Sequence, residues 1–199
     1  MSHHINRYIA LSTVALVALA GCSSQDDASV SNFQNVLQNY YDEQAEPATC
    51  IAHTIDEFPY TPDTSHFSWG RGDKEEQLEA LTDAGLIAQP DTGTYQLTET
   101  GQSAFQPNEG FCFGKMTVAE VTNFTEPNER GGFTISQVNY TVGVAERPDW
   151  SQNETLVETF GLSESGLRAS GFMSRNDNPD QKKMILVKTN NGWVTERDM

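Results

Sequence analysis

Few side chains in this sequence could do acid, base or metal chemistry. His53 and His66 are the only histidines after the first 22 residues, so imidazole catalysis would have to use one of them. With Asp56 and Asp63 they could form a site of two imidazoles and one carboxylate, a ligand set found in metal centres. The spacing matches no metal-binding motif. We therefore expect no metal and no other cofactor, and keep these four residues as candidates.

Serine chemistry has one candidate segment, Gly-Leu-Ser-Glu-Ser-Gly at residues 161–166. A hydrolase serine sits on a tight turn with glycine two residues before and two residues after it, beside a histidine base. Ser163 has Gly161 before it, but Ser165 occupies the place of the second glycine. The sequence therefore favours a polar turn.

Aromatic side chains are frequent between residues 40 and 69. They could line a groove for a ligand or partner, although packing in the core and under loops is the more common use. The aromatic residues of this stretch are Tyr40, Tyr41, Phe58, Tyr60, Phe67 and Trp69.

The N-terminus has the pattern of a secretory signal. Arg7 precedes an apolar run of eleven residues, 9–19, and no acidic residue lies before that run. As a helix the run would be about 16 Å long, roughly half the ~30 Å hydrocarbon core of a bilayer. We expect a signal peptide over residues 1–21 and not a membrane-spanning helix.

The residues that end this signal, Leu19-Ala20-Gly21-Cys22, resemble the lipobox of bacterial lipoprotein precursors. The resemblance covers about the first 24 residues. It implies cleavage before Cys22 and acylation of that cysteine, palmitate included, which would hold the protein on a membrane through several acyl chains. Ser23 after the cysteine, where Asp signals inner-membrane retention, implies the outer membrane and a body facing the periplasm. Residues 22–31 are polar and are expected to form a flexible tether.

Cys50 and Cys112 are the cysteines that remain after Cys22. An even pair in an oxidising compartment predicts a disulfide. A nucleophilic or metal-binding thiol would need a basic group or further ligands nearby. The apolar neighbours of Cys112 supply none.

Charge is unevenly distributed along the chain. The whole chain has 12 basic and 28 acidic residues and a net charge of −16, which argues against nucleic acid as a partner. Residues 22–111 hold 2 basic and 16 acidic residues, whereas residues 112–199 hold 9 and 12. This asymmetry predicts two modules, an acidic helical one with a hairpin over 32–111 and a β-rich one over 112–199.

The first module has two helix patterns and one hairpin pattern. Apolar residues spaced three and four apart predict a helix over 33–41, with Ser31 and Gln34 as a capping box. A second helix is expected over 73–85, with Gly85 at its C-terminus. A turn at 90–93 between apolar residues predicts a hairpin over 86–97.

The segment from Leu78 to Gly101 resembles the recognition helix and wing of winged-helix proteins. A helix that reads DNA presents Arg, Lys, Asn or Gln, but residues 73–85 hold five acidic residues and one lysine. The resemblance therefore implies a way of packing without the DNA-binding function.

The second module shows the alternation of strands. Strands are expected near 116–121 and 133–144. In the second of these, the apolar residues change from odd to even positions near Ser136 and Gln137, which predicts a β-bulge there. Asn190-Asn191-Gly192 predicts a closing hairpin. Residues 147–180 are expected to be mostly loop, with a short helix near 154–160.

Together these patterns predict an α+β fold, with a small helical, winged-helix-like module before an antiparallel sheet. We expect a lipid-anchored protein that acts as a non-enzymatic binding or envelope-accessory module, with an envelope protein as its partner. The alternative is a periplasmic hydrolase, metal-assisted or not, that uses His53 or His66 with Asp56 or Asp63.

Overall fold

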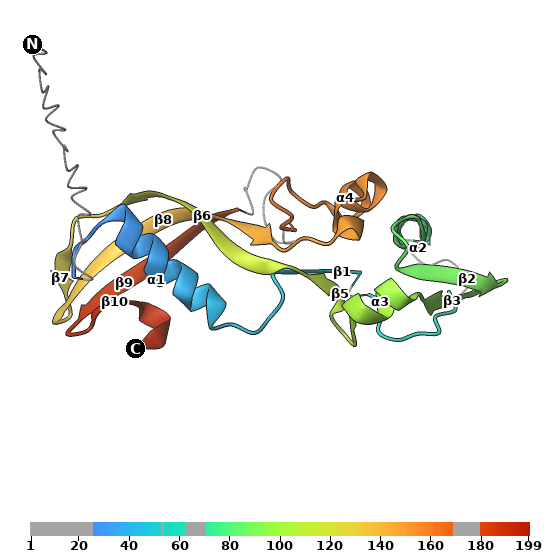
Figure 1. Ribbon diagram of the computed structural model, residues 1–199, viewed down its shortest axis with the longest axis horizontal. Coiled ribbons are helices and arrows are strands. Elements are labelled where there is room, and N and C mark those ends of the chain that lie inside the picture. Colours follow the sequence, from blue (N-terminus) through green and yellow to red (C-terminus); the bar gives the residue numbers. More distant parts are fainter. Residues whose placement is uncertain (1–25, 53, 63–70, 169–179) are drawn as a thin grey trace, which may run out of the picture.

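The fold is α+β, as predicted. The computed structural model describes residues 26–52, 54–62, 71–168 and 180–199 (Figure 1). Its strands are antiparallel. Helix α1 (Val30–Asp42) lies against the largest sheet, and α2 (Arg71–Asp83) and α4 (Glu154–Phe160) pack against each other. Cys22, His53, Asp63 and His66 lie outside the described residues.

The largest sheet has five strands in the order β10-β9-β8-β6, and β7 also pairs with β8. Strand β8 is its centre, because it pairs with β6 along one edge and with β9 along the other. The strands are β6 (Lys115–Phe124), β7 (Asn128–Arg130), β8 (Phe133–Ala145), β9 (Gln181–Thr189) and β10 (Gly192–Thr195). The predicted C-terminal hairpin is confirmed, with Asn190 and Asn191 as its turn.

The predicted β-bulge near Ser136 and Gln137 is wrong. Strand β8 pairs with β9 without a break from Ile135 to Thr141, and the shifts of register lie opposite, in β6. Ser136 occupies a fully buried core position, where its hydroxyl donates to the carbonyl oxygen of Thr125 at 2.7 Å. A satisfied hydroxyl is tolerated inside, so the alternation of β8 continues through the serine.

Helix α1 (Val30–Asp42) lies across one face of this sheet and packs on β6 and β10 (Figure 1). Phe33 and Leu37 are fully buried beneath it. The side-chain amide of Gln38 pairs with the edge of β6, accepting from the backbone N–H of Val118 at 2.8 Å. The N-cap of the helix is Ser29, and not Ser31 as the sequence predicted. The Ser29 side chain accepts a hydrogen bond from the backbone N–H of Asn32.

A smaller sheet of three short strands follows, in the order β1-β5-β4. It lies between the large sheet and the predicted hairpin region (Figure 1). Its strands are β1 (Thr49–Ile51), β4 (Phe105–Gln106) and β5 (Gly110–Phe113).

The far end of the molecule holds a helix, a hairpin and a short helix in chain order: α2 (Arg71–Asp83), β2 (Ile87–Asp91) with β3 (Thr94–Leu97), and α3 (Glu99–Ala104). We call this group of elements the hairpin end (Figure 1). Gly85 and Gly93 adopt positive φ angles of 71° and 89°, which end the helix and close the hairpin. The helix and hairpin predicted here are confirmed.

The predicted loop from 147 contains a 3-10 turn, η1 (Asp149–Gln152), and helix α4 (Glu154–Phe160), which packs against α2. The helix has the predicted bounds because Asn153 caps its first turn and Gly161, in the left-handed conformation, ends it. The chain finishes in a 3-10 turn, η2 (Glu196–Asp198).

The buried side chains form one hydrophobic cluster that runs from α1 and the large sheet to α2 and β2. It therefore continues across the predicted module boundary at residues 111 and 112. Among the described residues, no helix has the length and apolar character needed to span a membrane.

Candidate functional site

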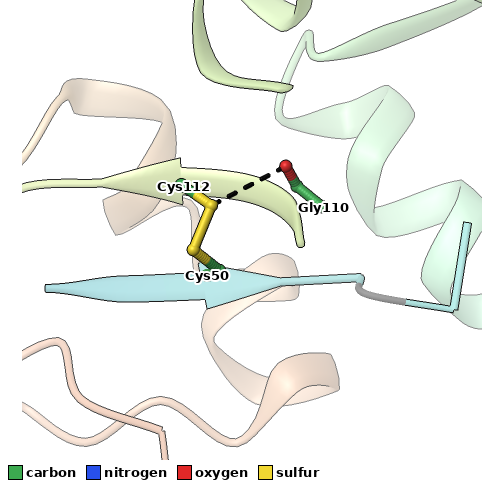
Figure 2. The surroundings of a disulfide bond; sticks show 3 residues. All are labelled: Cys50, Gly110 and Cys112. Atoms are coloured by element: carbon green, nitrogen blue, oxygen red, sulfur yellow. Dashed lines mark hydrogen bonds between the residues drawn. A yellow bond between two sulfur atoms is a disulfide. The ribbon is translucent and has the colours of Figure 1, made fainter. Parts of the chain in front are cut away.

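The disulfide predicted from the cysteine count is present between Cys50 and Cys112. These residues are directly opposite each other on β1 and β5, with Cα atoms 4.0 Å apart and sulfur atoms bonded (Figure 2). The Cys112 sulfur also lies 3.8 Å from the carbonyl oxygen of Gly110. Both thiols are consumed by the bond, so neither serves as nucleophile or metal ligand.

The four candidate metal or acid–base residues are not brought together in the part of the chain that the structure describes. Asp56 is exposed in the loop after β1, and the other three, His53, His66 and Asp63, lie outside the described residues. Within residues 26–52, 54–62, 71–168 and 180–199 no group of three His, Cys, Asp or Glu side chains could hold a metal ion. The hydrolase alternative stays a prediction.

Ser163 and Ser165 form a small polar network with Asp180. Both hydroxyls donate to the same carboxylate oxygen, at 3.0 Å and 2.5 Å, and the two oxygens are 2.7 Å apart. The backbone N–H of Leu167 donates to Ser163. Each hydroxyl has one proton, and Asp180 accepts both. Among the described residues, the contacts made by the two hydroxyls stabilise the turn and include no imidazole or amine that could deprotonate a serine.

The aromatic stretch divides into two separate groups, and Phe67 and Trp69 lie outside the described residues. Phe58 packs edge-on against Phe105 and Phe111, with ring centres 5.1 Å and 6.0 Å apart. Tyr40 and Tyr41 instead lie on α1. The described aromatics therefore pack the core and do not line one common groove.

A tyrosine cluster joins α1, β8 and the C-terminus. The hydroxyls of Tyr41 and Tyr140 lie 2.9 Å apart, and Arg197 donates to the Tyr40 hydroxyl at 2.8 Å. Burial raises the pKa of Tyr41, although its hydrogen bond with Tyr140 partly opposes the shift. Burial, with that same hydrogen bond, raises the pKa of Tyr140 far above its ordinary value. Tyr41 and Tyr140 therefore stay protonated at neutral pH and serve as structural contacts.

An open concave surface lies around Trp150. Two hollows of about 540 Å³ and 600 Å³ share Thr100 and Trp150, and we call them together the Trp150 groove. Helix α3 forms one wall, and the η1 segment forms the other. The indole is half-buried and packs edge-on against Phe113, with ring centres 5.1 Å apart.

The Trp150 groove is acidic. Among its described lining residues four are carboxylates and none is a lysine or arginine; the four are Asp83, Glu99, Glu146 and Asp149. Lys115, outside the lining, pairs with Glu146 at 2.8 Å, but both side chains are more than half exposed, so water screens the pair. Carboxylates beside an indole suit a positively charged group, which attracts both the acids and the ring face.

Sequence inspection did not identify this groove. Its residues come from four segments, 83–85, 99–104, 112–114 and 146–153, that meet only in the fold. The one available signal was the acidic excess of residues 22–111, which indicates a charge preference and no location.

Comparison with protein-family models, with curated proteins and with solved structures finds no match for this chain.

Proposed function

We propose that this chain is a lipid-anchored protein of the bacterial outer membrane whose body, facing the periplasm, binds an envelope partner without catalysis. The observation that carries the anchoring is the sequence Leu19-Ala20-Gly21-Cys22 after an apolar run of eleven residues. The Cys50–Cys112 disulfide supports it, because such bonds persist in the oxidising space outside the cytosol.

The binding surface that we propose is the Trp150 groove. Its size suits a peptide segment or a small ligand, and its four carboxylates favour a positively charged occupant. An exposed segment of an envelope protein that carries lysine or arginine has the required chemistry. The acidic groove and the disulfide-linked sheet that borders it would then supply recognition, and the acyl chains would supply location.

Lipid attachment is tested by growing cells with labelled palmitate and comparing the wild-type chain with Cys22→Ala. We expect label on the wild-type chain, a mass at its mature N-terminus that includes acyl chains, and neither on the variant. A wild-type chain with an unmodified N-terminal cysteine, or label that persists in Cys22→Ala, would refute the anchoring.

Binding in the groove is tested with a photo-crosslinking amino acid at Thr100, an exposed residue that lines both hollows. The matched control carries the crosslinker at Thr92, in the exposed turn of the β2–β3 hairpin. In intact envelopes we expect adducts from position 100 that disappear when Glu99→Gln and Asp149→Asn are combined, and not with Glu75→Gln on α2. The groove would be excluded as the site if position 92 gave as many adducts as position 100, or if the adducts from position 100 persisted in the combined Glu99→Gln and Asp149→Asn variant.

A further inference from the structure

The chain between Cys22 and the folded body is too short to let the body move freely. Residues 23–25 are the only ones between that cysteine and Asp26. The carbonyl oxygen of Asp26 accepts from the indole N–H of Trp193, at the start of β10, at 3.1 Å. Four residue steps span at most about 14 Å when fully extended. Acyl chains on Cys22 would therefore hold the bilayer close to this part of the body.

This part of the molecule is one end of the large sheet. We call it the sheet end and define it by Asp26, the first turn of α1, the β7–β8 turn at 131–132 and the β9–β10 turn at 190–191. These features lie together at the left of Figure 1, opposite the hairpin end.

Exposed apolar side chains are concentrated at the sheet end. Among the described residues three large apolar side chains are exposed, and two of them begin elements here: Val30 begins α1 and Phe133 begins β8, and each is 49% exposed. Met199, at the C-terminus, is the third. Apolar side chains of this size favour the boundary between lipid headgroups and acyl chains.

Apolar side chains also lie on the sheet face opposite α1. Phe133 and Ile135 lie on the same side of β8, and Ile135 is paired with Val187 of β9, which is paired with Val194 of β10. Trp193, the neighbour of Val194, packs on Phe33 of α1, so Val194 faces away from the helix. An apolar row thus runs across three strands beside the sheet end, in which Val187 is buried and Ile135 and Val194 are partly exposed.

The distribution of charge favours an orientation in which the hairpin end points away from the bilayer. The hairpin end, residues 71–104, holds 7 acidic and 2 basic residues, whereas the sheet end has Asp26, with Asp27 next to it, and no basic residue. Bilayers that contain anionic lipid therefore repel the hairpin end more strongly. Electrostatic repulsion therefore directs the hairpin end away from the lipid.

We propose that the sheet end is a membrane-facing surface, with Val30 and Phe133 at the headgroups of the bilayer that holds the acyl chains of Cys22, and with the hairpin end directed away. This inference rests on the proposed lipid anchor. It adds an orientation, which leaves the Trp150 groove accessible to a partner.

The test uses the full lipidated protein in vesicles of phosphatidylethanolamine and phosphatidylglycerol. A fluorophore is attached to a new cysteine at Asn190 or, as the matched control, at Thr92; both are exposed turn residues at opposite ends. The disulfide and the acylated Cys22 leave the new thiol as the one available for labelling. We expect a quencher on the lipid headgroups to quench the label at position 190 several-fold more than the label at position 92.

A charge variant tests the contact itself. Phe133→Asp should reduce the quenching at position 190, because a carboxylate avoids the headgroup boundary, whereas Gln96→Asp on β3 should leave it unchanged. The exposure of both side chains makes folded variants the expected outcome, which circular dichroism checks.

The outcomes separate this inference from the proposed function. If mass analysis finds no acyl chain on Cys22, the proposed anchor fails whatever the labels report. If Cys22 is acylated but both labels are quenched equally, the orientation alone is wrong. A label at position 190 that is shielded from both lipid and aqueous quenchers would show that another protein, or a second copy of this chain, covers the sheet end, and would also overturn the inference.

Discussion

The sheet end and the hairpin end are built in opposite ways. At the sheet end Phe33 of α1 packs edge-on against Phe124 of β6 and Trp193 of β10, with ring centres 4.9 Å and 5.0 Å apart. These three residues lie far apart in the sequence. At the hairpin end α2, β2, β3 and α3 follow one another directly, joined by short turns. The same chain therefore stabilises one end by distant contacts and the other by local ones.

The two ends nevertheless share one core. The hydrophobic cluster is continuous between them, and the Cys50–Cys112 disulfide closes a loop that contains the whole hairpin end and none of the sheet end. This arrangement predicts that both ends unfold together, and that the disulfide in addition limits local opening of the end that it encloses.

The largest effect is expected for Phe33→Ala. The ring is fully buried, so its removal should lower the free energy of unfolding by about 3 to 5 kcal/mol. Urea unfolding measures the loss, with Asn35→Ala on the exposed face of α1 as the control. Hydrogen exchange should rise at both ends if the core is cooperative; faster exchange confined to α1 and the large sheet would show that the ends unfold independently.

Removal of the disulfide should have the next largest effect. Cys50→Ser with Cys112→Ser frees the chain between them, and we expect a loss of roughly 2 to 4 kcal/mol. Hydrogen exchange should rise at both ends through global unfolding, and it should rise further in α2, β2 and β3 through local opening that the disulfide no longer limits. Equal changes at both ends would contradict the asymmetry. Thiol titration of the unfolded wild-type body should find two free thiols only after reduction.

The same contrast explains what the sequence could predict. Helix α4 has the bounds expected from the sequence, and Asn153 and Gly161, both within the local sequence, cap its two ends. The β2–β3 hairpin likewise depends on the glycine at position 93. Local capping and turn residues determine such elements, so a reader of the sequence can find them.

Features that depend on distant partners were missed. Ser136 interrupts an apolar pattern in the sequence, yet β8 keeps its register. The serine is tolerated in the core because the carbonyl oxygen of Thr125, on a neighbouring segment, accepts a hydrogen bond from its hydroxyl. Ser29 and Ser31 could each cap α1; the observed cap is Ser29, close to where the Asp26 carbonyl is held by Trp193. The Trp150 groove could not be predicted from the sequence for the same reason, because its walls come together only after folding.

Gly101→Ala tests the packing of the hairpin end. A methyl group on this buried glycine of α3 would overlap the carbonyl oxygen of Leu86, which belongs to the backbone and cannot rotate away. We expect a loss of about 1 to 3 kcal/mol. Ser103→Ala, at an exposed position of the same helix, is the control. Wild-type stability in Gly101→Ala would mean that α3 shifts freely against β2, so that the hairpin end is loosely packed.

Tyr140→Phe should have the smallest effect at neutral pH and a distinctive effect at alkaline pH. Loss of its hydroxyl removes the contact with Tyr41, which costs about 1 kcal/mol. Burial raises the pKa of both tyrosines above the ordinary value of 10.0, so above pH 10 the unfolded chain loses these protons before the folded chain does. The stability of the wild-type protein is therefore constant with respect to these groups below about pH 9 and falls above pH 10.

Urea unfolding between pH 7 and pH 11 should show a shallower alkaline decline in Tyr140→Phe, and Tyr95→Phe at the hairpin end should keep the wild-type slope. An unchanged slope in Tyr140→Phe would remove the tyrosine cluster as the cause of the alkaline decline.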